Sequence, residues 1–260
     1  MSFLYNFDMS KVISHFKLMP KETQISAEVN VVDVINQSFV VSGDQDYLAA
    51  RFMAINGLSR AFFWAAAQAV EKYFKAFLLM NGLSVQTYKG HPIIKLFEAS
   101  QSVDLSISRL DISPHVCIPI NSSVNKHIRR FTVVELLKDF EKYGSADNRY
   151  NIFGIDFNTG HLLALDALIF QLRELIGVDP IEKSFSNLGS DVLNTFQKYN
   201  PWFYPGVPMT EVPNPQFPIS NYINATKYEI LEKNKKNPAC RLALVWLRKH
   251  MRLPESKFPD

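Results

Sequence analysis

Apolar residues recur at the spacing of an α-helix in five segments of the chain between residues 44 and 177. Helix start and stop signals bound most of these segments, with Asp or Thr before the first turn and Gly after the last. The expected starts are Asp44 or Asp46, Arg60, Pro92, Thr132 and Thr159, and the expected stops include Gly57, Asn81-Gly82, Gly144 and Gly177. Because five amphipathic helices can enclose a core, the pattern predicts an all-α helical bundle.

The segment from Arg60 to Met80 carries the strongest helical pattern, since it is rich in Ala and contains neither Gly nor Pro. On a helical wheel its polar residues occupy an arc of roughly 100°, and apolar residues fill the remainder. It is therefore expected to be the central helix. Glu71 and Lys75 are spaced for an ion pair. The polar arc is interpreted either as a solvated helix face or as a groove in which these two residues bind a ligand.

The flanks of this region are less regular. Residues 24–41 are rich in β-branched side chains in partial alternation, which indicates either a short strand pair or an irregular arm. Between Pro201 and Pro218 six prolines are interleaved with aromatic residues, so this stretch is expected to cross the surface of the bundle. Asn237-Pro238 is expected to open a final helix. The predicted division is an N-terminal arm over 1–43, a bundle over 44–180 and a C-terminal extension over 181–260 that packs on the bundle.

Composition narrows the classes to which the protein can belong. A hydrophobic content of 47% supplies a core, and an aromatic content of 13% also favours a buried subunit interface. A net charge of +3 does not by itself indicate nucleic-acid binding. The two cysteines lack the spacing of a zinc site, so neither a metal nor a cofactor is expected. No secretory signal and no apolar run of membrane-spanning length occur, so a cytoplasmic protein without a membrane partner is expected.

Three stretches of sequence follow one another at suitable separations. They are Asp46-Tyr-Leu-Ala-Ala-Arg51, the run from Phe63 to Leu79 that contains Gln-Ala-Val-Glu-Lys-Tyr-Phe-Lys-Ala, and Gly90-His91-Pro-Ile-Ile-Lys-Leu96. Together they resemble the first three helices of a HEPN domain. The resemblance covers roughly residues 44 to 177 and implies an up-and-down helical bundle that forms a homodimer. His91, at the start of the third helix, is interpreted as a residue that caps the helix or hydrogen-bonds to a neighbouring one.

The resemblance also implies where a catalytic pair would lie. HEPN members that cut RNA have an Arg and then a His with four to six residues between them, and they need no metal. Arg149 lies at the expected place, but residues 154 to 156 are Gly, Ile and Asp, and the first His that follows is His161. Arg109 and His115 have the right spacing, although chance alone supplies about 0.7 such matches. They also come too early in the order of helices, so the catalytic signature is incomplete where it is expected.

Two basic clusters are candidates for binding phosphate groups. The first cluster contains Lys126, Arg129 and Arg130. Together with Arg149 and Tyr150 at the expected HEPN site, these residues form one candidate binding site. The second is the C-terminal segment 227–252, which contains eight Lys or Arg against two Glu. Short basic runs are also common on ordinary solvated helix faces, so both interpretations stay open for each cluster.

The sequence as a whole favours a HEPN-like protein that binds a nucleotide, RNA or a protein partner without catalysing a reaction. The resemblance implies a role in a prokaryotic toxin–antitoxin, defence or stress system, in which a nucleotidyltransferase is a frequent partner. One alternative is a metal-independent endoribonuclease with a non-standard Arg/His site. Another is a structural dimerisation module.

Overall fold

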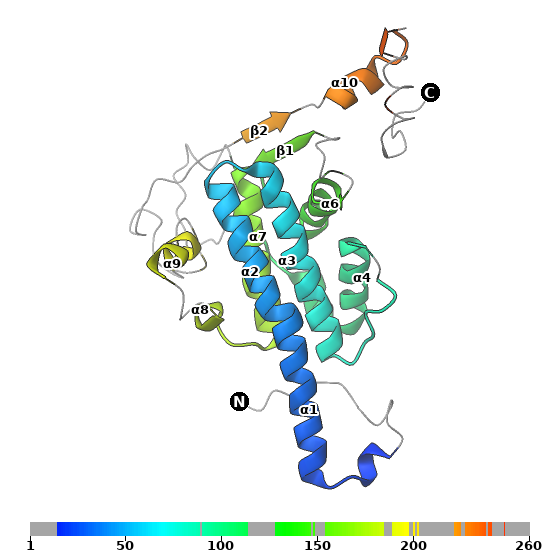
Figure 1. Ribbon diagram of the computed structural model, residues 1–260, viewed down its shortest axis with the longest axis vertical. Helices are drawn as coiled ribbons and strands as arrows, with labels where there is room; N and C mark the ends of the chain where they lie inside the picture. Colours follow the sequence, from blue (N-terminus) through cyan, green and yellow to red (C-terminus); the bar gives the residue numbers. More distant parts are fainter. Residues whose placement is uncertain are drawn as a thin grey trace.

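The computed structural model describes residues 15–88, 90–113, 128–146, 148, 154–184, 189–197, 200, 202, 221–224, 227–237, 239–240 and 247. The described part is mostly helical, as predicted (Figure 1). Its α-helices are α1 (Lys21–Ile35), α2 (Ser42–Ile55), α3 (Ser59–Met80), α4 (Ile93–Val103), α6 (Val133–Tyr143), α7 (Thr159–Ile176), α8 (Ile181–Ser184), α9 (Ser190–Gln197) and α10 (Lys227–Lys233). Shorter elements are η2 (Phe16–Leu18), η3 (Asn36–Val41), η4 (Leu105–Arg109), β1 (Ile155–Asn158) and β2 (Asn221–Asn224). Among these helices none has the length and hydropathy needed to cross a membrane.

One long helical rod runs from α1 through a π-helical segment, η3, into α2. The junction residues Asn36 and Val41 keep right-handed helical backbone angles, so no loop separates the three elements. The prediction of a strand pair or an irregular arm over residues 24–41 is therefore wrong. β-branched residues disfavour a helix only weakly, and neither Gly nor Pro interrupts residues 21–42.

The start predicted for the first bundle helix is also wrong. Asp44 and Asp46 lie inside the rod and cap no helix, and the predicted boundary at residue 43 falls within it. Asp44 is instead buried, and Asp46 forms an ion pair with Lys72 of α3 at 2.6 Å. The acidic residues at this point thus join α2 to its neighbours and do not begin a helix.

α3 is the central helix, as predicted, and contacts α2, α4, α6 and α7 (Figure 1). Most of its Ala residues and all of its Phe residues are buried. The small side chains let neighbouring backbones approach closely, and the aromatic rings fill the spaces between helices. Gly144, just after α6, shows how close the approach is, because a Cβ there would lie 2.5 Å from the carbonyl oxygen of Phe63.

Several predicted helix boundaries are confirmed. Thr132 and Glu135 form a capping box at the start of α6. α7 begins at Thr159 and ends at Ile176, just before Gly177, whose φ of 75° is left-handed. Farther along, the Asn237 side chain accepts a hydrogen bond from the backbone N–H of Ala239 at 2.9 Å, as expected of a helix cap.

Parts of the C-terminal extension contact the bundle. β2 pairs with β1 in an antiparallel ladder, in which Ile155 lies opposite Asn224. α9 lies against α2, where Arg51 Nε donates to the carbonyl oxygen of Thr195 at 3.3 Å. Of the Pro-rich stretch between 201 and 218, all but Trp202 falls outside the described residues.

Arg51, Tyr47 and Asp166 form a buried cluster between α2 and α7. Arg51 pairs with Asp166, neither side chain has exposed surface, and Tyr47 Oη donates to the Asp166 carboxylate at 2.6 Å. Burial raises the pKa of the Asp166 carboxyl, and the charge on Arg51 opposes that rise. Burial alone would lower the pKa of the Arg51 guanidinium, but Asp166 and Tyr47 hold it above its ordinary value. The pair fixes how α2 sits on α7, because separating the two charges would leave each buried without an opposite charge.

Asp44, Tyr73 and Arg173 form a second buried cluster, which joins α2, α3 and α7. The Asp44 carboxylate pairs with Arg173 and accepts a hydrogen bond from Tyr73 Oη. Burial raises the pKa of the Asp44 carboxyl, and Arg173 opposes this rise. A second guanidinium nitrogen of Arg173 donates to the carbonyl oxygen of Asp179, so the cluster also holds the chain that follows α7.

Candidate functional site

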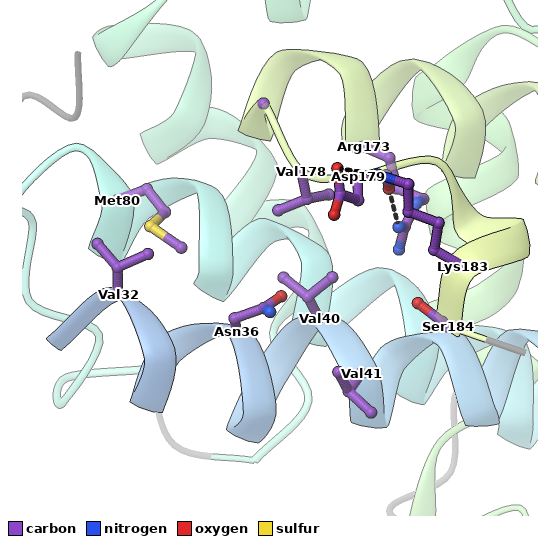
Figure 2. Close-up of a pocket in the computed structure, with 11 residues that line it drawn as sticks. Val32, Asn36, Val40, Val41, Met80, Arg173, Val178, Asp179, Lys183 and Ser184 are labelled. Carbon is purple, nitrogen blue, oxygen red and sulfur yellow. Dashed lines mark hydrogen bonds and ion pairs between the residues drawn. The ribbon is translucent and has the colours of Figure 1, made fainter. Parts of the chain in front are cut away.

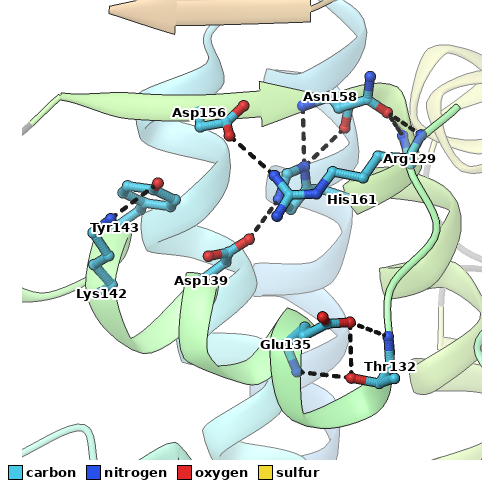
Figure 3. A network of polar contacts seen from close by, with 10 residues as sticks. Arg129, Thr132, Glu135, Asp139, Lys142, Tyr143, Asp156, Asn158 and His161 are labelled. Carbon is cyan, nitrogen blue, oxygen red and sulfur yellow. Dashed lines mark hydrogen bonds and ion pairs between the residues drawn. The ribbon is translucent and has the colours of Figure 1, made fainter. Parts of the chain in front are cut away.

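Arg129 and His161, two of the predicted site residues, lie close together where α7 begins (Figure 3). Asn158 caps α7, and its Oδ1 accepts hydrogen bonds from the N–H of Gly160 at 2.8 Å and of Arg129 at 2.9 Å. A Cβ on Gly160 would lie 2.0 Å from the carbonyl oxygen of Arg129. The absence of a side chain at residue 160 therefore lets the segment before α6 dock on the first turn of α7.

His161, a candidate catalytic residue, has no exposed surface. Its Nδ1 accepts a hydrogen bond from the backbone N–H of Asn158 at 3.0 Å, and its Nε2 lies 3.2 Å from Oδ2 of Asp139. The ring packs between Phe131, at 4.2 Å between ring centres, and Phe63, at 5.1 Å. With both nitrogens engaged and the ring enclosed, His161 completes the cap of α7 and ties it to α6.

Arg129 and Arg130 are exposed at this end of the bundle. The Arg129 side chain retains 46% of its surface, donates from Nη1 to Oδ2 of Asp156 at 3.0 Å and lies 4.8 Å from the ring centre of Phe131. Exposed ion pairs of this kind contribute roughly 0–1 kcal/mol. A phosphate group can therefore replace Asp156 as the partner of Arg129 at little cost.

The remaining predicted residues of this site are not all described. Lys126, Arg149 and Tyr150 fall outside the described residues. Asn148, next to Arg149, accepts a hydrogen bond on Oδ1 from Arg60 of α3 at 3.0 Å. This contact holds the residue before Arg149 against the start of α3.

The second candidate pair is not brought to this end. Arg109 is exposed at the end of η4, and His115 falls outside the described residues. The chain just after Arg109 is held by Gln171, whose Oε1 accepts from the N–H of Asp111 at 3.0 Å. Gln171 lies ten residues along α7 from His161, which corresponds to about 15 Å. Arg109 therefore sits on a different part of the bundle from His161.

The polar arc of α3 forms a network of polar contacts with the chain before α4. Lys75 Nζ lies 2.6 Å from the Glu71 carboxylate, which confirms the predicted ion pair. The second Glu71 oxygen lies 2.5 Å from His91 Nδ1, and Gln68 lies 3.1 Å from the same ring nitrogen. The Glu71 side chain is only 7% exposed, so the expected solvated face does not extend to Glu71, and the network joins α3 to the chain before α4. The interhelix role predicted for His91 is confirmed.

A pocket of about 340 Å³ lies on another side of the bundle, where no candidate residue was predicted (Figure 2). Its walls come from the end of α1, from η3, from the last residue of α3, and from α7, α8 and the chain that joins them. These segments are far apart in sequence, and the sequence of η3 carries no signature of a π-helix. Among the described residues, no group of three or more His, Cys, Asp or Glu is placed to hold a metal ion.

Comparison with protein-family models, with curated proteins and with solved structures gives no match for this chain. The functional interpretation therefore rests on the residues and their geometry.

Proposed function

We propose that this chain is a HEPN-like protein that binds RNA or a nucleotide through phosphate groups at the end of the bundle, without cleaving it. The role suggested by the resemblance is regulatory, in a toxin–antitoxin, defence or stress system with a nucleotidyltransferase-type partner. The order and separation of the motifs on α2, α3 and α4 support the assignment to this family.

The observation that carries the proposal is the burial of His161. A general acid or base must come within hydrogen-bond reach of the proton that it transfers, which for RNA cleavage lies on a 2′-hydroxyl or on a leaving oxygen. A histidine without exposed surface, hydrogen-bonded at both nitrogens, cannot reach a polynucleotide. Arg129 and Arg130, in contrast, stay exposed beside it and can bind phosphate oxygens.

The binding test compares the wild type with a Lys126→Ala/Arg129→Ala/Arg130→Ala triple variant. Affinity for a short fluorescent single-stranded RNA is measured by anisotropy over a range of salt concentrations. Each lost phosphate contact reduces the slope of log affinity against log salt by about 0.7, so the triple variant should lose about 2 units of slope.

A matched control removes the same charge elsewhere, by Lys17→Ala/Lys95→Ala/Lys183→Ala at three exposed positions. This control should keep the wild-type slope. If both triple variants lost the same slope, binding would depend on net charge alone and the proposed site would be wrong. If neither variant changed it, the C-terminal basic segment would be the better candidate.

The cleavage test incubates the purified protein with total RNA in the presence of a chelator. No cleavage is expected. Cleavage that disappeared in an Arg149→Ala variant with an unchanged circular dichroism spectrum would establish the endoribonuclease alternative and overturn the non-catalytic proposal.

The proposal includes a homodimer, and α1 offers a surface for it. Figure 1 shows α1 projecting beyond its neighbours. Ile25 and Val29 lie one turn apart on α1, with exposures of 51% and 52%. An Ile25→Glu/Val29→Glu variant should be monomeric by light scattering at a concentration where the wild type is dimeric. Val34→Glu, about 180° around the helix from Ile25, is the matched control and should leave the dimer intact; a monomeric wild type would remove this part of the proposal.

A further inference from the structure

The pocket in Figure 2 has a charged end and an apolar end. Arg173, Asp179 and Lys183 gather at one end, while Val32 and Met80 line the other. Its volume of about 340 Å³ lies at the lower limit for sites that hold small organic molecules. A ligand that fits this distribution has a small charged head and a compact apolar body.

The π-helical geometry of η3 helps to shape the pocket. Asn36, Val40 and Val41 all line it, although residues five apart in an α-helix point about 140° away from each other. A π-helix forms its hydrogen bonds between residues i and i+5, so it turns less per residue than an α-helix and places its side chains differently. Asn36 and Val40 point toward the pocket in Figure 2, and they give it an amide and an apolar side chain. Short π-helical segments are rare and occur frequently at functional sites.

The charged end presents both signs to a ligand. Lys183 Nζ and the Asp179 carboxylate lie 3.0 Å apart, with exposures of 66% and 70%. Such an exposed pair contributes little stability, so each member can exchange its partner for a group on a ligand. Arg173 lies beneath them and is already neutralised by Asp44. A ligand with only a negative charge would be repelled by Asp179, and a ligand with only a positive charge would be repelled by Lys183.

We propose that this pocket binds an α-amino acid with an aliphatic side chain. The ligand carboxylate pairs with Lys183, the ligand ammonium pairs with Asp179, and the side chain packs against Val32, Val40 and Met80. A zwitterion satisfies both charges of the pocket, and a leucine-sized side chain suits its apolar end. This inference does not depend on the proposed RNA binding, because the two sites share no residue.

The test is isothermal titration calorimetry of the full chain with L-leucine and three analogues. Isocaproate lacks the amine, isoamylamine lacks the carboxylate, and glycine lacks the side chain. Leucine should bind, and each analogue should bind more weakly by about tenfold or more, since each leaves one part of the pocket unmatched. No binding of leucine, or binding of isocaproate or isoamylamine as tight as that of leucine, would overturn the proposal.

Variants locate the binding in the pocket. Asp179→Asn and Lys183→Met should each weaken leucine binding by about tenfold. Both positions are exposed, and the contact from Arg173 goes to the Asp179 backbone, so neither change disturbs the core. Lys95→Met, an exposed lysine of α4, is the matched control and should bind leucine as the wild type does. Unchanged affinity in both pocket variants would place any leucine binding elsewhere and would refute the assignment.

Discussion

Removing Asp166 tests whether the buried cluster between α2 and α7 holds the bundle together. In an Asp166→Ala variant, Arg51 keeps its charge without exposed surface and without its ion-pair partner, and Tyr47 loses the acceptor at 2.6 Å. Breaking a buried ion pair from one side destabilises a protein by about 3–5 kcal/mol. Total stabilities of folded domains are about 5–15 kcal/mol, so this single change should remove a large share of the stability.

The measurement is urea unfolding followed by far-ultraviolet circular dichroism, with the free energy of unfolding obtained by linear extrapolation. Lys183→Met is the matched control, because it breaks an exposed pair and should cost no more than about 1 kcal/mol. A double variant, Arg51→Met/Asp166→Leu, removes both charges and should be at least about 2 kcal/mol more stable than Asp166→Ala, since apolar replacements of buried pairs are often well tolerated.

The double variant separates two explanations for the loss in Asp166→Ala. The loss in Asp166→Ala could come only from the missing side-chain volume. In that case the free energy of unfolding of Arg51→Met/Asp166→Leu would exceed that of Asp166→Ala by no more than the added volume provides. Arg51→Met alone would then leave stability unchanged. A loss of less than about 1 kcal/mol in Asp166→Ala would contradict the reasoning directly, because a buried guanidinium that loses its counter-charge should cost more than that.

Three further predictions follow from the geometry. Gly160→Ala should lower the free energy of unfolding by about 1–3 kcal/mol and weaken RNA binding, since its Cβ displaces the Arg129 carbonyl; thermal unfolding and anisotropy measure the two effects. Burial raises the pKa of the Tyr47 and Tyr73 hydroxyls well above the ordinary value. At least these two of the ten tyrosines should resist spectrophotometric titration in the folded protein, and stability should fall as pH rises above about 10. Hydrogen bonds from Thr132, the cap of α6, lower the pKa of the Glu135 carboxyl. The stabilising contribution of Glu135 should therefore disappear as pH falls below about 4. Urea unfolding measures this loss, and a Glu135→Gln variant should not show it.

Local signals in the sequence predicted much of the bundle. The capping box at Thr132, the left-handed Gly177 and the uninterrupted run from Arg60 to Met80 each determine structure through neighbours within a few residues. The failure over residues 24–41 has a physical reason. Strand propensity of Val and Ile depends on having a strand to pair with, and without one these residues extend a helix that has no Gly or Pro to stop it.

The candidate site was harder to predict, because the burial of each side chain decides whether it can reach a ligand. His161 became a candidate as the first His after Arg149, but the spacing of Asn158 and His161 is that of a helix cap, in which the third residue reaches back to the cap backbone. That signal favours a structural role, which the structure confirms. The pocket beside η3 gave no signal, since residues 32–41 and 173–184 meet only through tertiary packing.

Among the described residues, those that carry the family resemblance and those proposed to bind ligands are different sets. Tyr47, Arg51 and Glu71 belong to the motifs, and each is committed to a buried contact with another part of the bundle. Charges neutralised inside a core are poorly available to a ligand, because moving them out would break pairs that cost several kcal/mol to separate. The motifs therefore argue for a fold, and an activity must come from groups left at the surface, such as Arg129 and Lys183. A Glu71→Gln variant should therefore have lower stability, while its folded molecules bind RNA with unchanged affinity. An Arg129→Ala variant should bind RNA more weakly and keep its stability.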